Sequence, residues 1–282
     1  MCAIPRFMRK SPLLVGLVSL FLPVPAHLTS MENKTESAES ASTSRTTVTW
    51  KNPAGAEHTA FAGPELLDEE LYLAGTIRTG NRYPGQRNYH GLHWFSNTGT
   101  HVWHESMFER QSLLWLDFTS DIVAIAAQPM RMDFTDGSTH FPDFIALHSD
   151  YRQVVYNVKP TRFLTEKAEA QFRNAAALCK QVGWGHEVIS DIDPTYMANI
   201  EWLAHYRQPV FAPLPDIRAE LLAAADEHLP IRDLAAAIDA NKWPAVIAAI
   251  YHLTWHGDLE VDLTYALTNA SLIGKKKLHA NA

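Results

Sequence analysis

The stretch that decides the fold begins HVWHESMFERQSLLWLDF (101–118), passes through FPDFIAL (141–147) and ends VVYNVKP (154–160). Apolar residues recur at helical spacing in the first segment, which predicts an amphipathic helix over roughly 104–118. The other two segments are rich in β-branched and aromatic residues, which favours strands. Pro160 ends the last strand, because proline cannot donate to a ladder. The expected core therefore starts with a helix followed by strands.

Further strand patterns follow this helix. IVAIAAQP (122–129) and MRMDF (130–134) predict two strands on either side of a proline kink. AspGly at 136–137 is a strong hairpin signal, so a partner strand is expected over 140–147 and the next strand over 152–159. From these four segments we expect a core of three antiparallel strands.

A second helix and a last strand complete the expected core. Thr165 can cap a helix from about Glu166 to Val182, and Gly183 ends it. Residues 185–190 predict a strand, which should join the sheet in parallel because a long helix precedes it. The fold class is therefore expected to be α/β, in the order helix, three antiparallel strands, helix, strand.

A small second domain is expected at the C-terminal end. A helix from Asp193 to about Tyr206 ends the first domain, and the proline-rich residues 208–215 form a linker. Three helices and a terminal hairpin then predict a winged-helix-like module: the helices near 216–227, 230–239 and 243–256 and the strands 260–263 and 270–273. The third helix has almost no arginine or lysine, so docking to a protein explains it at least as well as DNA binding.

The first 47 residues are expected to lie outside the folded part. A basic start, the apolar run Leu13–Leu22 and the small residues at 23–26 have the pattern of a secretory signal. The other explanation is that translation begins at Met31, followed by a polar, disordered segment. Because two cysteines fit a reducing compartment, we favour the second explanation and a cytoplasmic location. The expected domains are thus 1–47, 48–206 (with a motif core of about 85–190) and 207–282.

The charge balance limits how this protein could meet nucleic acid. There are 24 Lys and Arg against 31 Asp and Glu, a net charge of −7. That balance gives no global attraction for nucleic acid, so any DNA contact is expected to be local or to depend on a partner. Arg78, Arg82 and Arg87 could contact phosphates locally, although a solvated loop is the more expected explanation of their turn-rich surroundings.

Polar residues of the predicted strands could converge on a metal ion. Asn157 and Lys159 share a face of their strand, while Val158 points into the core and can offer its carbonyl. Hairpin pairing brings Asp143 beside them, and Glu109 approaches from the helix. Mg²⁺ prefers carboxylate, amide and carbonyl oxygens and can activate water for phosphodiester hydrolysis, with the lysine offsetting charge. By spacing alone, however, an Asp and a Lys on adjacent strands more often form a surface ion pair.

The motifs PDF (142–144) and NVKP (157–160) resemble the signature of the PD-(D/E)XK nucleases, whose restriction-endonuclease-like core has the element order expected above. More narrowly, residues 104–118 with the run IVAIAAQP and the PDF motif resemble the TnsA family, the endonuclease subunits of heteromeric cut-and-paste transposases. The resemblance covers about residues 85–205, and the C-terminal helices fit the family's second domain. One position departs: Asn157 stands where most PD-(D/E)XK enzymes have an acid and TnsA-like proteins can have glutamine.

The resemblance implies a metal-dependent DNA endonuclease that hydrolyses one strand at transposon ends. Its cofactor would be Mg²⁺, for which Mn²⁺ can substitute. The catalytic residues would be Glu109, Asp143 and Lys159, and the metal ligands would be Asp143, Asn157, Glu109 and the carbonyl of Val158. Glu105 is the competing acid of the helix.

The resemblance also implies partners and leaves alternatives. The partners would be DNA (transposon ends), a DDE-type transposase subunit and an ATPase regulator, with no membrane. The rival interpretation is a catalytically weak or inactive nuclease fold that acts as an assembly factor, because asparagine at 157 loses a charge and a methylene of reach. A nuclease that serves defence or repair is a third.

Overall fold

The computed structural model describes residues 45–78, 89–239 and 241–276, and the chain there has a mixed α/β fold with several small sheets and six helices. Most of the expected N-terminal segment, as well as Arg82 and Arg87, lies outside the described residues. In the described part of the chain, no helix has both the length and the apolar character needed to cross a membrane.

A central sheet has the four strands β5 (Ile122–Ala127), β8 (Phe144–His148), β9 (Gln153–Val158) and β10 (Gly185–Ile189). Their spatial order is β10-β9-β8-β5; β5, β8 and β9 are antiparallel neighbours, and β10 runs parallel to β9. The parallel pair requires a crossover, which the helix between β9 and β10 supplies. The observed order is therefore helix, three antiparallel strands, helix and strand, but the three strands are β5, β8 and β9, and residues 130–133 are not part of this sheet.

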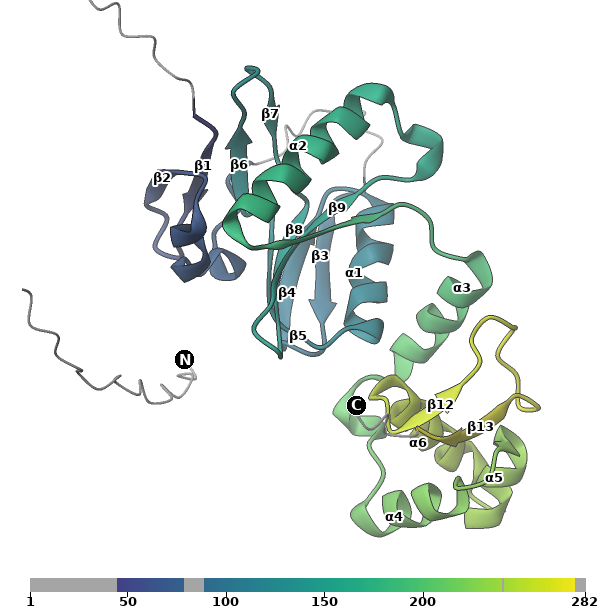
Figure 1. Ribbon diagram of the computed structural model, residues 1–282. Helices are drawn as coiled ribbons and strands as arrows, with labels where there is room; N and C mark the ends of the chain where they lie inside the picture. Colours follow the sequence, from purple (N-terminus) through teal and green to yellow (C-terminus); the bar gives the residue numbers. More distant parts are fainter. Residues whose placement is uncertain (1–44, 79–88, 240, 277–282) are drawn as a thin grey trace, which may run out of the picture. The chain divides into compact units, whose positions relative to one another are not determined.

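Two helices cover opposite faces of this sheet (Figure 1). Side chains alternate between the faces of a strand, so Phe144 and Tyr156 pack with α1 (Met107–Thr119), whereas Ile145 and Val155 pack with α2 (Glu166–Val182). As predicted, the Thr165 hydroxyl accepts the N–H of Ala168 at the start of α2, and Gly183 ends it at φ +100°.

The strand predicted over 130–134 lies in a second sheet and not in the central one. The strands of this second sheet are β1 (Thr47–Lys51), β2 (Glu57–Phe61), β6 (Met130–Asp133) and β7 (Thr139–His140), in the order β2-β1-β6-β7. The predicted strand over 140–147 is divided, because the chain passes from one sheet to the other at Phe141–Asp143. Pro129 and Pro142 lie at the two crossings, where a missing N–H interrupts each ladder.

Between β2 and α1 the sequence predicted less than the structure contains. Residues 64–73 contain a pair of 3₁₀ turns, Pro64–Asp68 and Leu71–Leu73. The antiparallel hairpin of β3 (Gly91–Phe95) and β4 (Thr100–His104) was not predicted. Its histidines and tryptophans obscure the alternation of a strand.

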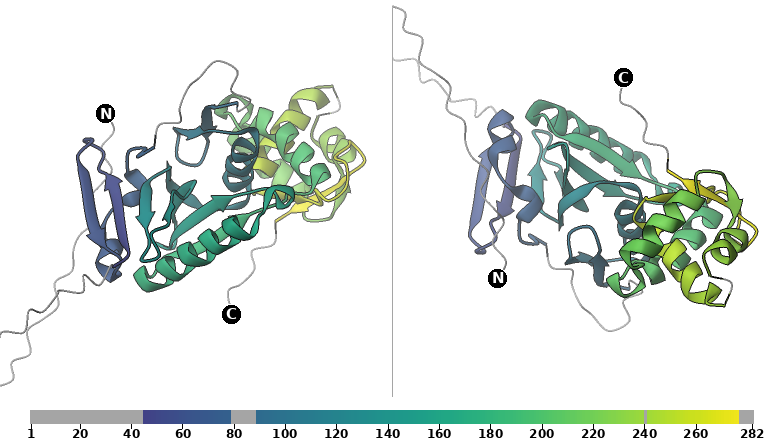
Figure 2. Two further views of the ribbon diagram at one scale, coloured as in Figure 1. Left: turned by 90° about the horizontal axis from the view of Figure 1, so that it is seen from above. Right: turned by 90° about the horizontal axis from the view of Figure 1, so that it is seen from below.

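The predicted C-terminal helices and strands are present with ends shifted by up to three residues: α3 (Pro194–Leu203), α4 (Pro215–Ala224), α5 (Ile231–Asp239), α6 (Trp243–Trp255), β12 (Leu259–Val261) and β13 (Leu272–Lys275). The short strand β11 (Leu229–Pro230) was not predicted. The three strands form a sheet in the order β11-β13-β12. Ile200 and Leu203 of α3, and Leu114 of α1, share one apolar core with α4, α5 and α6. These C-terminal helices lie together in both views of Figure 2.

Candidate active site at the end of the central sheet

Asp143 is fixed where the chain enters β8. Its N–H donates to the carbonyl of Tyr156 (3.1 Å), and its own carbonyl accepts the N–H of Gln128 (2.8 Å). Its carboxylate oxygen Oδ2 accepts the N–H of Val158 at 2.7 Å. Neighbouring strands on both sides therefore hold Asp143 at this end of the sheet.

Negative charge is crowded around Asp143. Burial raises its pKa to about 8, and the charges of Glu109 and Glu105 act in the same direction. The N–H of Val158 and the positive charge of Lys159 oppose this rise. Burial also raises the pKa of Glu109. Because strongly perturbed carboxylates gather at functional sites, this cluster is the candidate active site.

Glu109 is occupied with the start of its own helix. Its Oε2 accepts the N–H of Glu105 (2.6 Å), and its Oε1 accepts the hydroxyl proton of Ser106 (2.9 Å). The Ser106 hydroxyl in turn accepts the N–H of Glu109 at 3.1 Å. This reciprocal Ser-x-x-Glu arrangement closely resembles a capping box, which satisfies backbone groups at a helix start. Both carboxylate oxygens of Glu109 are therefore already in use.

The hydrogen bonds of Glu109 at the start of α1 are expected to stabilise the folded protein. Glu109→Ala should lower the free energy of unfolding by about 1 kcal/mol, because the bonds to Glu105 and Ser106 are lost. Glu109→Gln should unfold like wild type, since glutamine also completes a capping box. Urea denaturation of the three proteins checks this. Equal destabilisation by both variants would mean that the charge of Glu109, and not its hydrogen bonds, stabilises the fold.

Two other oxygens near Asp143 have no hydrogen-bond partner. They are Oε1 of Glu105 and Oε1 of Gln128, and both are buried. Gln128 has φ +45°, a left-handed conformation that is uncommon outside glycine. Neither oxygen could have been identified from the sequence, because the signal is a missing partner in three dimensions.

Lys159 directly follows β9, although the sequence predicted it as the last residue of that strand. Its N–H donates to the carbonyl of Ile189 at 2.9 Å, so β10 fixes its backbone. Its charge is close enough to lower the pKa of Asp143 against the effect of burial. Glu109 and Lys159 therefore both lie within electrostatic reach of Asp143.

Arg78 also lies at this end of the sheet. The central carbon of its guanidinium is 5.6 Å from the centroid of the Phe141 ring, two residues before Asp143. Its charge opposes the rise in the pKa of Glu109. Arg78 is therefore positioned to contact an anion bound near the acids.

The side chain of Asn157 is not free to act as the expected metal ligand. Asn157 is fully buried; its Oδ1 is 2.7 Å from Nε2 of His140, and its Nδ2 donates to Nε2 of His186 at 2.8 Å. Burial lowers the pKa of both histidines, so both are neutral at pH 7. One imidazole donates to the amide and the other accepts from it. Val158 packs into the core as predicted, and the metal role of its carbonyl stays a prediction.

The donor set here suits a small hard cation with few protein ligands. Across the described ranges, no three His, Cys, Asp or Glu side chains are grouped closely enough to hold a metal ion. Mg²⁺ usually binds through one or two carboxylates, keeping several waters and taking substrate phosphate oxygens. Asp143 and Glu105 meet that requirement, and the unpartnered oxygen of Glu105 is consistent with it.

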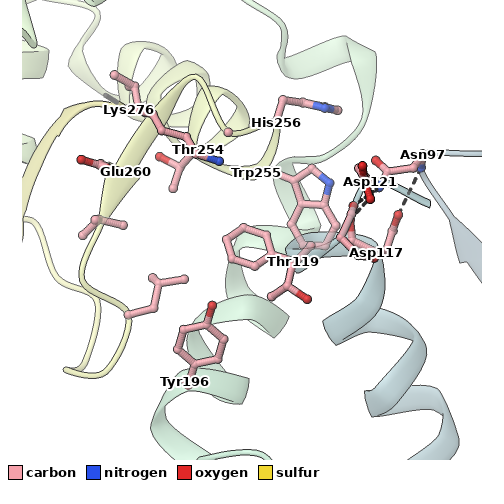
Figure 3. A pocket seen from close by; sticks show the side chains of 16 residues that line it. Asn97, Asp117, Thr119, Asp121, Tyr196, Thr254, Trp255, His256, Glu260 and Lys276 are labelled. Atoms are coloured by element: carbon pink, nitrogen blue, oxygen red, sulfur yellow. Dashed lines mark hydrogen bonds between the residues drawn. The ribbon is translucent and has the colours of Figure 1, made fainter. Parts of the chain in front are cut away.

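A separate cavity of about 580 Å³ lies between the C-terminal ends of α1 and α6 and strand β12 (Figure 3). Its most buried acid is Asp117, which accepts the N–H groups of Ser96 (2.9 Å) and Asn97 (3.1 Å). The indole N–H of Trp255 donates to the Ser96 hydroxyl at 3.1 Å. These groups connect the turn after β3 to both helices, and their hydrogen bonds are already made. Asp117 therefore serves the fold.

Comparison with known proteins adds no relative. No protein-family model matches the chain, and a search of curated proteins finds no match. The functional argument therefore rests on the geometry around Asp143 and on the motif resemblance of residues 104–160.

Proposed function

We propose that this protein is a Mg²⁺-dependent DNA endonuclease, similar to the TnsA subunit of heteromeric transposases, that hydrolyses one strand at transposon ends. The observation that carries the proposal is the position of Asp143 at the end of the central sheet, where acids of α1, Lys159 and Arg78 meet it. Those are the residue types that hydrolysis of a phosphodiester needs.

The connectivity of the core supports the same proposal. Helix α1, the strands β5, β8 and β9, helix α2 and the parallel strand β10 follow one another in the order of a restriction-endonuclease-like fold. In this proposal α1 and the starts and ends of the strands provide the site. Fold alone does not imply function, so the argument depends on the residues.

Each residue has a role in the proposed reaction. The bound metal would supply Lewis-acid stabilisation and a more acidic water. Asp143, with one of the two acids at the start of α1, Glu105 or Glu109, would hold that metal. Lys159 would orient the attacking water and offset the charge that develops on the phosphate. Arg78 would hold a neighbouring phosphate in register.

The C-terminal elements support a docking role. The order α4, β11, α5, α6, β12, β13, with the sheet β11-β13-β12, is that of a winged helix. Most of α6 is buried, from Val246 to Trp255, so the helix that would enter a DNA groove is unavailable. We therefore assign this domain to a protein partner, a DDE-type transposase subunit or an ATPase regulator, in the cytoplasm.

One observation favours the second candidate, an inactive assembly factor with a nuclease fold. It is the engagement of Asn157 with His140 and His186, which leaves the position of the usual acid without a metal ligand. The two candidates make opposite predictions for DNA cleavage.

Lys159→Ala tests the proposal directly. With Mg²⁺ or Mn²⁺, transposon-end DNA and the partner subunits, the variant should cleave about a hundredfold more slowly than wild type, because a preorganised positive charge is lost. Lys180→Ala is the control, since Lys180 is exposed on α2. Intact DNA with wild type, in a complex that has assembled, would overturn the enzyme and favour the assembly factor.

A further inference from the structure

Two buried oxygens at the candidate site lack an explanation. Oε1 of Glu105 and Oε1 of Gln128 are buried and make no hydrogen bond. A buried polar atom without a partner destabilises the folded state, and native proteins rarely contain one without a water, an ion or a catalytic reason. Both oxygens belong to residues next to Asp143 or within electrostatic reach of it.

Gln128 lies directly across the ladder from Asp143. Ala127 pairs with Phe144, and the next N–H, that of Gln128, donates to the carbonyl of Asp143 at 2.8 Å. Side chains of directly opposed residues start about 5 Å apart. Gln128 is nearly fully buried and keeps a left-handed backbone at φ +45°. Such conformations cost energy and tend to persist at functional sites.

Glu105 lies just before α1, within electrostatic reach of Asp143. Its N–H donates to Oε2 of Glu109, which fixes the backbone there. The charge of Glu105 acts on Asp143 in the same direction as that of Glu109. The two acids differ in one respect: the oxygens of Glu109 are bonded to the helix cap, whereas Oε1 of Glu105 is unbonded.

We infer that Glu105, Gln128 and Asp143 are the protein ligands of the divalent cation, and that Gln128 supplies the amide oxygen that Asn157 does not. The inference rests on the proposed function only for the use of that cation. Two carboxylates and one amide oxygen leave the remaining positions to water and a DNA phosphate, as Mg²⁺ prefers. Glu109 then has a positioning role, because its cap holds Glu105 in place.

Mn²⁺ titration of the full-length, metal-free protein tests this ligand set without DNA. Free Mn²⁺ is followed by electron paramagnetic resonance. Glu105→Gln and Gln128→Leu should each weaken Mn²⁺ binding by about tenfold or more. Glu109→Gln should weaken it less than Glu105→Gln does. Glu166→Gln, an exposed acid at the start of α2, should bind Mn²⁺ like wild type.

Gln128→Glu adds a gain of binding to the test. A carboxylate in place of the amide should tighten Mn²⁺ binding, because a ligand oxygen gains charge. If Oε1 of residue 128 is remote from the metal, the new acid gains no partner, so Mn²⁺ binding would not tighten. Gln128→Leu should fold at least as stably as wild type without metal, since an unpaired buried oxygen is removed. Thermal unfolding checks this.

The outcomes separate this inference from the proposed function. Wild-type Mn²⁺ affinity in both Glu105→Gln and Gln128→Leu, or no saturable Mn²⁺ binding by wild type, would overturn the ligand set. If Lys159→Ala nevertheless abolished cleavage, the nuclease would stand without it. Mn²⁺ affinity that depends on Glu105 and Gln128, in a protein that cleaves no DNA, would leave the ligand set standing and overturn the nuclease.

Discussion

Asp143→Asn is expected to abolish DNA cleavage and, at the same time, to make the metal-free protein more stable. The cleavage rate should fall about a thousandfold or more, because Asp143 is a proposed metal ligand and asparagine removes its negative charge. The gain in stability should be about 0.5–2 kcal/mol at pH 8, the size typical of relieving a strained functional site. Asparagine keeps an oxygen that can accept the N–H of Val158.

The pH dependence of this effect has a definite sign. The pKa of Asp143 is about 8 in the folded protein, above the ordinary 3.8 of the unfolded chain. Between these values the folded state keeps a proton that the unfolded state has released, so wild-type stability falls as the pH rises. Asp143→Asn does not titrate there. The advantage of the variant should therefore be absent near pH 3.8 and complete above pH 8.

Urea denaturation at pH 5 and pH 9, with a chelator, measures the difference. Asp150→Asn is a useful control, because Asp150 is exposed and the neighbouring Arg152 lowers its pKa. Mg²⁺ or Mn²⁺ should stabilise wild type by mass action and leave Asp143→Asn unchanged. A variant less stable than wild type at pH 9 would contradict the crowding of charge around Asp143.

The sequence was most informative where local patterns determine the structure. Helical spacing in 104–118, the cap at Thr165 and the turn at 136–137 act through neighbouring residues, and each corresponds to an observed element. Pro129 was recognised as an interruption, whereas Pro142 was placed inside the strand expected over 140–147. That they carry the chain into a second sheet depends on β1, more than seventy residues earlier, so no local pattern could predict it.

The sequence predicted which residues lie around Asp143, and not the hydrogen bonds that occupy Glu109 and Asn157. Asp143, Lys159 and Glu109 come together because strand pairing and helix packing follow from the pattern. The motif around Glu109, Ser-x-x-Glu, fits a helix cap as well as it fits a catalytic acid, and sequence cannot separate the two. The hydrogen-bond partners of Asn157, His140 and His186, belong to two other strands, β7 and β10. Their contacts depend on tertiary packing.

That network around Asn157 leads to the second large effect, on stability. Asn157→Leu should lower the free energy of unfolding by about 2–4 kcal/mol, because two buried imidazole nitrogens lose their partners in a side chain of similar size. His140 and His186 are the groups affected. Equal stability of Asn157→Leu and wild type in urea denaturation would show that the network contributes nothing.

Asn157→Asp is the second variant to compare, because a carboxylate can accept a hydrogen bond from both imidazoles. In wild type the lowered pKa values of His140 and His186 mean that the unfolded state binds more protons below about pH 6.5, so stability falls with acid. The carboxylate should raise both pKa values and weaken or reverse that loss, which unfolding at pH 5.5 and pH 8 would measure. The Mn²⁺ affinity of Asn157→Asp shows the role of residue 157. If the new carboxylate stays between the two histidines, Mn²⁺ affinity should equal that of wild type. If the carboxylate binds the metal, Mn²⁺ affinity should increase. Tighter binding in Asn157→Asp would return Asn157 to the metal site and place the two histidines around it in a supporting role.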